Sequence, residues 1–238
     1  MSRYYYNLIA SMVRGEAVPS NPLWNDLLAY YTADNTPNDA LGTYNGTLTN
    51  GATYGTGKIN QGFSLDGVND YVNFGNVLDF DGSTPFSISC WTYSTNINSL
   101  KFIIGKAFAG VPYTGYGMFF YQNKIRCFIQ QVEGTDSLYK TGSVNLSVNT
   151  WYHITMTYDG SKTVAGLKVY VDGSVYSMID NYDNFTGSSS NSKNFTIGVK
   201  ENTWYYSGIQ DEVGIWNREL TASEVTQLYN SGAGLQYT

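Results

Sequence analysis

From Leu23 onward the chain consists of short runs in which apolar and polar residues alternate, separated by turn sequences. Alternation with a period of two is typical of strands with one buried face, and Asp-Gly or Asn-Gly between such runs favours tight reversals. These pairs begin at Asn45, Asn50, Asp66, Asp81, Asp159 and Asp172. The strands that the pattern predicts are Leu27–Thr32, Ile59–Leu65, Asp70–Phe74, Phe86–Tyr93, Phe102–Gly105, Tyr116–Tyr121, Lys124–Gln130, Trp151–Tyr158, Asn194–Val199 and Gly208–Trp216.

A hairpin is predicted where Leu167–Val171 leads through Asp172-Gly173 into Ser174–Met178. A two-residue turn of this kind needs positive φ, which Gly adopts freely and Asp tolerates. The turn sets a register with an apolar face, in which the expected pairs are Val171 with Ser174, Val169 with Tyr176 and Leu167 with Met178.

One helix is predicted near the end of the chain, over Thr221–Gly232. Thr221 and Glu224 have the spacing of a capping box, in which each side chain satisfies a backbone N–H at the helix start. Gly232 is the expected stop. The apolar face, which we expect to cover a sheet edge or a loop, consists of Val225, Leu228 and Tyr229.

Two antiparallel sheets packed face to face are the architecture that these elements predict, because no helices lie between the strands to cover one large sheet. The expected fold class is therefore all-β, a sandwich over residues 23–238 with one short C-terminal helix. Residues 1–22 differ from this pattern, with three consecutive tyrosines, two arginines, and prolines at Pro19 and Pro22. They are expected to form an arm that either docks onto a partner or packs against its own domain.

Composition narrows the classes of function. The chain has 238 residues, of which 42% are hydrophobic and 13% charged, and its formal net charge is -6. Binding to nucleic acid or to anionic lipid needs clusters of basic residues, which the sequence lacks. No run approaches the roughly 18 apolar residues of a membrane span. We therefore expect no nucleic-acid partner and no membrane insertion.

The two cysteines and the amino terminus bear on the cellular compartment. Cys90 and Cys127 occupy inward-looking positions of two predicted strands and are expected to be free, buried thiols, although a single bridge between the strands stays open. The first residues lack the apolar stretch of about 7–15 residues that a secretory signal needs. Export through the general secretory route is therefore not expected.

Several short motifs follow one another in order along the chain. They are Phe63-x-Leu-Asp-Gly67, Phe86-Ser-Ile-Ser-Cys-Trp91, Trp151-Tyr-His-Ile154, Leu167-x-Val-Tyr-Val-Asp-Gly173, Ile197-Gly198, Gly208-Ile-x-Asp-Glu-Val213 and Trp216-Asn-Arg-x-Leu220. In this order, over roughly residues 27–230, they resemble the laminin-G-like branch of the concanavalin A-like lectin/glucanase superfamily. The resemblance implies a jelly-roll β-sandwich with one concave and one convex sheet, a fold that serves lectins, adhesion domains and glycosidases alike.

Glycosidase chemistry needs two carboxyl groups on either side of one bond. The glucanases of the superfamily carry them in a Glu-x-Asp-x-Glu run, which this sequence lacks. Asp211 and Glu212 are adjacent and are expected to point to opposite faces of a strand, and the single histidine, His153, is interpreted as a hydrogen-bonded strand residue. The sequence therefore predicts that the protein is not an enzyme.

A calcium ion is the expected cofactor. The loop from Asp39 to Gly46 offers carboxylate, carbonyl and amide oxygens, which suit Ca²⁺. Asp211 is expected on the core-facing side of its strand, where a carboxylate needs compensation. The resemblance implies a calcium site near one rim of the sandwich, which would be formed by Asp39, the Gly42 carbonyl, Asn45 and Asp211. The alternative is a capped turn together with a buried Asp held by hydrogen bonds.

Glycan binding would use aromatic side chains in loops, because sugars present apolar C–H faces. Two loops supply candidates outside the core pattern, with Tyr113 in one and Trp204 and Tyr205 in the other, and Asn202 offers a polar partner. Tyr206 is assigned to the core because the family has a core aromatic there. The alternative is that these loops pack against their own domain or a neighbouring subunit.

These features predict a non-catalytic recognition or structural domain. The arm and the polar, weakly charged surface favour a place on a phage virion, as a capsid-decoration or tail-associated protein that holds other virion proteins through residues 1–22 and binds host-surface glycans. The alternative is a free or secreted carbohydrate-binding module at the cell surface or outside the cell. A glycoside hydrolase is a third hypothesis, which the missing carboxylate pair disfavours.

Overall fold

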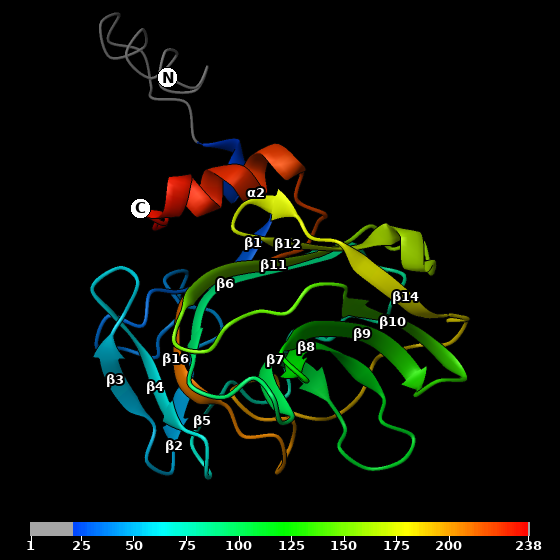
Figure 1. The fold of residues 1–238 in the computed structure, drawn as a ribbon, viewed down its shortest axis with the longest axis horizontal. Helices are drawn as coiled ribbons and strands as arrows, with labels where there is room; N and C mark the ends of the chain where they lie inside the picture. The colour runs from blue at the N-terminus through cyan, green and yellow to red at the C-terminus, as the bar shows by residue number, and fades with distance from the viewer. Residues whose placement is uncertain (1–20, 238) are drawn as a thin grey trace, which may run out of the picture.

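Two antiparallel sheets stacked face to face make up residues 21–237, the part of the chain that the computed structural model describes (Figure 1). The first sheet has the order β13-β12-β11-β6-β16-β4-β3, with β1 paired to β16. Its strands are β1 (Leu27–Tyr31), β3 (Thr53–Thr56), β4 (Gln61–Asp66), β6 (Phe86–Ser94), β11 (Trp151–Tyr158), β12 (Leu167–Val171), β13 (Ser174–Val175) and β16 (Ser207–Trp216). The predicted all-β sandwich is confirmed.

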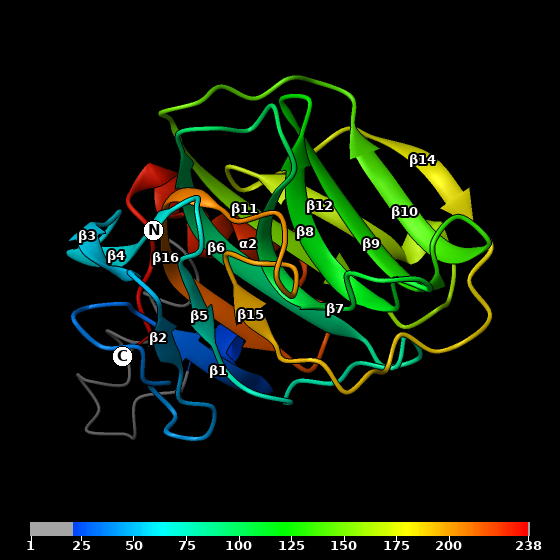
Figure 2. The same ribbon diagram turned by 90° about the horizontal axis from the view of Figure 1, so that it is seen from below.

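The second sheet has the order β14-β10-β9-β8-β7-β15-β5-β2. Its strands are β2 (Thr47–Thr49), β5 (Tyr71–Asn73), β7 (Lys101–Ala107), β8 (Gly115–Tyr121), β9 (Lys124–Val132), β10 (Asp136–Gly142), β14 (Met178–Asp183) and β15 (Thr196–Ile197). The helical segments are η1 (Pro22–Trp24), η2 (Val164–Gly166), α2 (Ala222–Tyr229) and η3 (Asn230–Gly232). Figure 2 looks onto the second sheet from outside, with β7 to β10 in front of the first sheet and α2 behind it.

The core lies between the sheets, where the apolar faces of the alternating strands meet. Phe86 of β6 and Tyr116 of β8 bring ring centroids of the two sheets within 5.1 Å of each other. Cys90 and Cys127 are both buried in this core and free, in agreement with the expected unbridged thiols. Burial raises the pKa of both thiols to about 12, so they are protonated and unreactive in the folded state.

Helix α2 covers the outer face of the first sheet (Figure 1), where a sheet edge or a loop was expected. Its capping box forms as expected, with the Thr221 hydroxyl accepting from the Glu224 N–H and the Glu224 carboxylate accepting from Thr221. The helix ends earlier than predicted, because Asn230 takes the left-handed conformation (φ 48°) before Gly232 is reached. In the part of the chain that the structure describes, no helix is long and apolar enough to span a membrane.

The predicted hairpin is shorter than expected. Val171 pairs with Ser174 as predicted, and the Tyr176 N–H donates to the Val169 carbonyl. The expected pairing of Leu167 with Met178 is wrong, because the chain leaves the first sheet after β13 and Met178 pairs with Gly142 in the second. The arm predicted over residues 1–22 lies outside the described residues up to residue 20, and Pro22 already belongs to η1.

A β-bulge in β16 changes the expected orientation of Asp211. The register against β6 shifts between Asp211 and Gly214, and Glu212 has a φ of 48°. A bulge inserts an extra residue and reverses the alternation of side chains beyond it. Gln210 therefore points into the core, where its Nε2 donates to the Ile103 carbonyl of the opposite sheet at 3.0 Å. Asp211 points away from the core, so its expected place beside the core-facing residues of β16 is wrong.

Candidate functional site

The candidate site is organised by a tight turn that follows β15. Lys200 and Thr203 exchange backbone hydrogen bonds of 3.0 Å, and Glu201 adopts a left-handed φ of 54° between them. After the turn, the Trp204 carbonyl accepts from the N–H of Phe102 in β7 at 2.7 Å, which anchors the segment to the second sheet. The turn thereby divides its side chains between an aromatic cage and a polar pocket.

The aromatic cage consists of Tyr113, Phe128 and Trp204, whose rings surround the ammonium of Lys200. The Lys200 Nζ lies 4.4 Å from the ring centroid of Trp204, 5.1 Å from that of Phe128 and 5.3 Å from that of Tyr113. Attraction between an ammonium and the negative faces of aromatic rings contributes about 0.5–2 kcal/mol per contact, the upper end applying to desolvated sites. The cage thus joins a loop, a strand and the turn around one cation.

Tyr113 reaches the cage from the loop between β7 and β8. Its carbonyl accepts from the Gln130 Nε2 at 2.7 Å, and its N–H donates to the Gly110 carbonyl at 2.6 Å. The first of these bonds ties the loop to β9, the strand that supplies Phe128, and the second closes a turn within the loop. The position of the Tyr113 ring is therefore set by the framework of the second sheet.

The electrostatics of Lys200 are unusual for a lysine. Only 3% of the residue is exposed, and burial lowers the pKa of its ammonium to about 8, against the opposing influence of Glu133 and Glu201. Within the described residues, its Nζ forms neither a hydrogen bond nor an ion pair, so the rings are its only close partners there. The Nζ is not among the fully buried polar atoms that lack a partner, so the ammonium is not wholly enclosed by the rings.

An aromatic row continues from the cage across the outer face of the second sheet, the face seen in Figure 2. The row consists of Trp204, Phe119, Tyr139 and Tyr182, with successive ring centroids 4.9, 6.2 and 6.0 Å apart. Arg126 borders the row and donates to the Tyr139 hydroxyl at 3.2 Å. Tyr182 is 42% exposed, so the row ends at a ring that is open to solvent.

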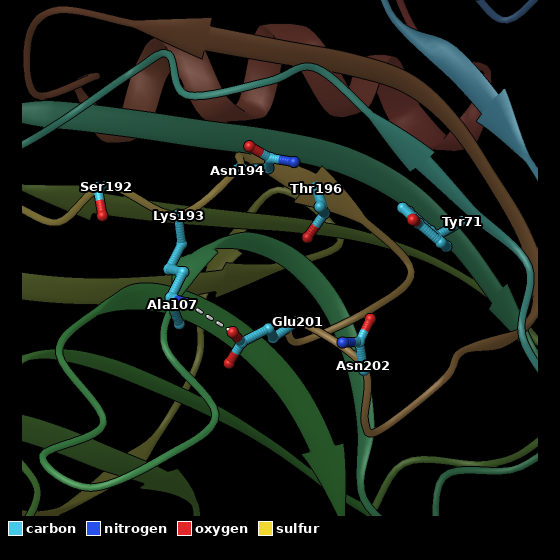
Figure 3. A pocket seen from close by; sticks show the side chains of 8 residues that line it. All are labelled: Tyr71, Ala107, Ser192, Lys193, Asn194, Thr196, Glu201 and Asn202. Atoms are coloured by element: carbon cyan, nitrogen blue, oxygen red, sulfur yellow. Dashed lines mark ion pairs between the residues drawn. The ribbon is translucent and has the colours of Figure 1, made fainter.

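A polar pocket of about 270 Å³ lies on the other side of the turn (Figure 3). It is lined by Tyr71, Ala107, Ser192, Lys193, Asn194, Thr196, Glu201 and Asn202. Lys193 and Glu201 form an ion pair of 2.7 Å within it, and the Glu201 carboxylate also accepts from the Ala109 N–H at 2.8 Å. Hydroxyl, amide and charged groups thus converge on a space the size of a small polar ligand.

The structure brings together three of the four residues predicted to bind a glycan. Tyr113 and Trp204 meet in the cage, and Asn202 lines the adjoining pocket. Tyr205 is half-buried, and its carbonyl accepts from the Lys101 Nζ at 2.8 Å, but its ring belongs to neither feature. Tyr206 is fully buried, as predicted. Glycan binding by these residues stays a prediction.

The sequence analysis missed Lys200, Lys193, Glu201, Phe119 and Phe128. The sequence did offer one signal for this site: Lys200 and Trp204 are only four positions apart, which places a lysine beside several aromatic residues in one turn. Phe119 and Phe128 looked like ordinary strand residues, because alternation shows that a side chain is on one face without showing which face lies outside.

The residues predicted to hold calcium do not fit such a site as a set. The two Asp39 oxygens accept four backbone N–H groups, from Tyr30, Leu41, Thr43 and Tyr44. These bonds occupy about all the acceptor positions of a carboxylate. The Asn45 Oδ1 accepts from the Asp39 N–H at 3.1 Å, and Gly42 donates to the Asp39 carbonyl at 2.8 Å. The hydrogen bonding of the loop is thus that of a capped turn, the alternative to a calcium site that the sequence left open.

Asp211 is held separately from that loop. Its oxygens accept the N–H groups of Lys58, Ile59 and Glu212 at 2.8–2.9 Å. Within residues 21–237, no group of three or more His, Cys, Asp or Glu side chains could hold a metal ion. Calcium binding by this chain stays a prediction, and an unchanged melting curve after EDTA treatment and calcium re-addition would contradict it.

Solved structures with a similar fold include a domain of an arabinanase, a toxin binding domain and part of a sialidase. Domain 4 of AbnA, an extracellular arabinanase from Geobacillus stearothermophilus solved with arabinotriose, is 22% identical with a TM-score of 0.61, over 85% of this chain and 97% of that one. The binding domain of Paraclostridial Mosquitocidal Protein 1 is 17% identical with a TM-score of 0.70, over 88% and 53%. A Trypanosoma rangeli sialidase solved with sialic acid is 15% identical with a TM-score of 0.64, over 93% and 35%.

The coverage differs among these neighbours. The chain matches nearly all of the arabinanase domain, but only about half of the toxin binding domain and a third of the sialidase. A search of curated proteins found no match to the sequence. A family model does match, over residues 66–226, which is more than half of the chain. The chain therefore belongs to the laminin G-like family of the concanavalin A-like lectin/glucanases superfamily.

Proposed function

We propose that this domain is a non-catalytic glycan-binding module whose binding surface comprises the aromatic cage, the aromatic row and the polar pocket. The observation that carries the proposal is the convergence of Tyr113 and Trp204, from loops far apart in the sequence, beside a polar pocket that contains Asn202. Ring faces suit the C–H surfaces of a sugar, and the amide and ion pair of the pocket suit its hydroxyls. The neighbours solved with arabinotriose and sialic acid give this ligand class further support.

The absence of catalysis is part of the proposal. Asp211 and Glu212, the adjacent acidic pair of β16, are 0% and 4% exposed. The Glu212 carboxylate accepts from the Tyr30 hydroxyl and from the Gln236 amide, so it is engaged within the fold. Incubation with any oligosaccharide that binds should leave the oligosaccharide intact, and release of new reducing ends would contradict this part of the proposal.

Replacement of Trp204 by Ala tests the binding surface. Trp204 contributes to both the cage and the row, so the variant should bind its glycan at least about tenfold more weakly, a loss of about 1.4 kcal/mol. The measurement is a glycan array that includes arabino-oligosaccharides, sialylated glycans and bacterial surface polysaccharides, followed by titration of the strongest binder. Trp151→Ala is the matched control, because Trp151 is also half-buried but lies in the first sheet. Equal binding by both variants, or no binding to any glycan, would contradict the proposal.

We further propose that the domain acts on the surface of a phage virion, as a capsid-decoration or tail-associated protein that recognises host-surface glycans. The support is compositional: a Tyr- and Arg-containing segment precedes the domain, and the remaining surface is polar and weakly charged. A free or secreted carbohydrate-binding module is the alternative, favoured by the neighbour that is a domain of an extracellular arabinanase.

Deletion of residues 1–20 distinguishes these locations. The strands of both sheets lie between Leu27 and Trp216, so the shortened chain should still fold. On the virion hypothesis the full chain sediments with large particles, whereas the shortened chain stays in the supernatant. Retained sedimentation would exclude the arm as the attachment, and a full chain that never sediments with particles would favour the free module.

A further inference from the structure

The ammonium of Lys200 lies among aromatic rings and has no oxygen acceptor from the described residues. Ammonium groups have three N–H donors, and the cage offers them ring faces in place of oxygen acceptors. Lys106, the other buried lysine of the described domain, has acceptors: it donates to Asn76 and pairs with Asp79. The half-buried Lys101 donates to the Tyr205 carbonyl. Lys200 is more buried than Lys101 and lacks the acceptors that Lys106 has.

We propose that Lys200 is the recognition group for the carboxylate of an acidic sugar, such as a sialic or uronic acid residue. This inference rests on the proposed glycan-binding function and specifies its ligand class. A carboxylate brings the oxygen acceptors that the ammonium lacks, and a charge-assisted hydrogen bond in a site of low dielectric is stronger than one made in water. The ring of the same sugar would lie against the half-exposed rings of Tyr113 and Trp204.

The charges around the site are compatible with an anionic ligand despite the net charge of -6. Glu201, the acidic residue next in sequence, is already paired with Lys193 at 2.7 Å and capped by the Ala109 N–H. Arg126 lies along the aromatic row, where it adds a second positive charge to the same face. Glu133 is exposed to solvent, so its repulsion of a ligand is screened.

The discriminating ligands are sialyllactose and a galacturonic acid oligosaccharide, each compared with its carboxyl-reduced form. The full-length protein should bind one of the acidic forms at least about tenfold more tightly than its reduced counterpart. Lys200→Met keeps the length of the side chain and removes its charge. This variant should therefore bind the acidic and the reduced form about equally. Lys58→Met is the matched control, because the Lys58 Nζ also lies over an aromatic ring, 4.4 Å from the ring centroid of Trp91, but outside the candidate site, and this variant should keep the preference.

The outcomes separate this inference from the proposed function. Equal binding of acidic and reduced forms by the unaltered protein would overturn the inference and leave glycan binding intact, and this comparison needs no variant to fold. Preference retained in Lys200→Met, or lost equally in Lys58→Met, would also overturn it, with melting curves confirming that each variant is folded. Failure of every glycan to bind would instead refute the proposed function itself.

Discussion

Buried polar side chains in this domain differ in how they are satisfied. His153 is 2% exposed, and its Nε2 lies 2.8 Å from the Ser89 hydroxyl, which confirms its interpretation as a hydrogen-bonded strand residue. Burial lowers the pKa of His153 to about 3, so the ring is neutral at physiological pH. Lys200 is as buried but keeps its charge among aromatic rings. Polar residues with internal partners therefore support the fold, whereas the charge of Lys200 faces aromatic rings.

Glu212 should make the stability of the domain depend on pH. Burial raises the pKa of Glu212 to about 8 and that of Asp211 to about 7. The folded state therefore holds protons that the unfolded state releases near pH 4–4.5, and the free energy of unfolding should fall as pH rises toward about 8. His153 is neutral in both states above about pH 6.5 and does not contribute there.

Glu212→Gln removes one of these titrations while keeping a side chain that can accept from Tyr30. Between about pH 6.5 and 8.5 its melting temperature should fall less than that of the unaltered protein, where each kcal/mol corresponds to about 2–4 °C for a domain of this size. Thermal denaturation at the two pH values measures the difference. Asp26→Asn is the control, because the Asp26 side chain is 65% exposed. Parallel melting curves for Glu212→Gln and the control would contradict the prediction.

At the scale of elements, the first turn of α2 concentrates its stabilising contacts. The Glu224 carboxylate accepts from the Thr221 N–H and hydroxyl and from both terminal nitrogens of Arg218. Thr221→Ala should lower the free energy of unfolding by about 1 kcal/mol, because it leaves the Glu224 N–H without its cap. Chemical denaturation measures this loss. Ser223→Ala, in the same exposed turn, should change stability by less than about 0.5 kcal/mol, and equal effects of the two variants would exclude a capping role.

The elements that the sequence predicted are those with a strong apolar alternation. The expected strands at Phe86–Tyr93 and Trp151–Tyr158 lie within one residue of β6 and β11. The strands β2, β3, β10 and β14 were not predicted. The strand β14 illustrates the reason that such strands escape prediction. Five of its six residues are exposed, and an edge strand with two solvated faces has no alternation of apolar and polar residues. The bulge at Glu212 was also missed, because a local left-handed residue leaves no trace in the alternation.

At the scale of the whole molecule, features that depend on neighbouring residues could be predicted from the sequence, whereas contacts between residues far apart in the chain could not. The family resemblance and the stacked sheets could be inferred, since both depend on local motifs and their order. The two aromatic loops could be chosen as candidates, because they fall outside the core pattern. Their meeting at Lys200 could not be predicted, because it depends on how the turn after β15 crosses toward β9. The expected calcium set stays a prediction, and the structure holds two of its members, Asp39 and Asp211, in separate hydrogen-bond networks.

The two ends of the described chain leave the domain from one place. Trp24 packs against Tyr237 with ring centroids 5.3 Å apart, in a cluster that includes the buried side of α2. Helix α2, which belongs to this cluster, lies on the outer side of the first sheet (Figure 1), whereas the aromatic row lies on the outer face of the second sheet. A scaffold joined at either end would therefore stand at the back of the domain. If several copies were attached to one scaffold in this way, their aromatic rows would all face outward. Each copy could then bind a repeating polysaccharide weakly, and the combined contacts would give avidity.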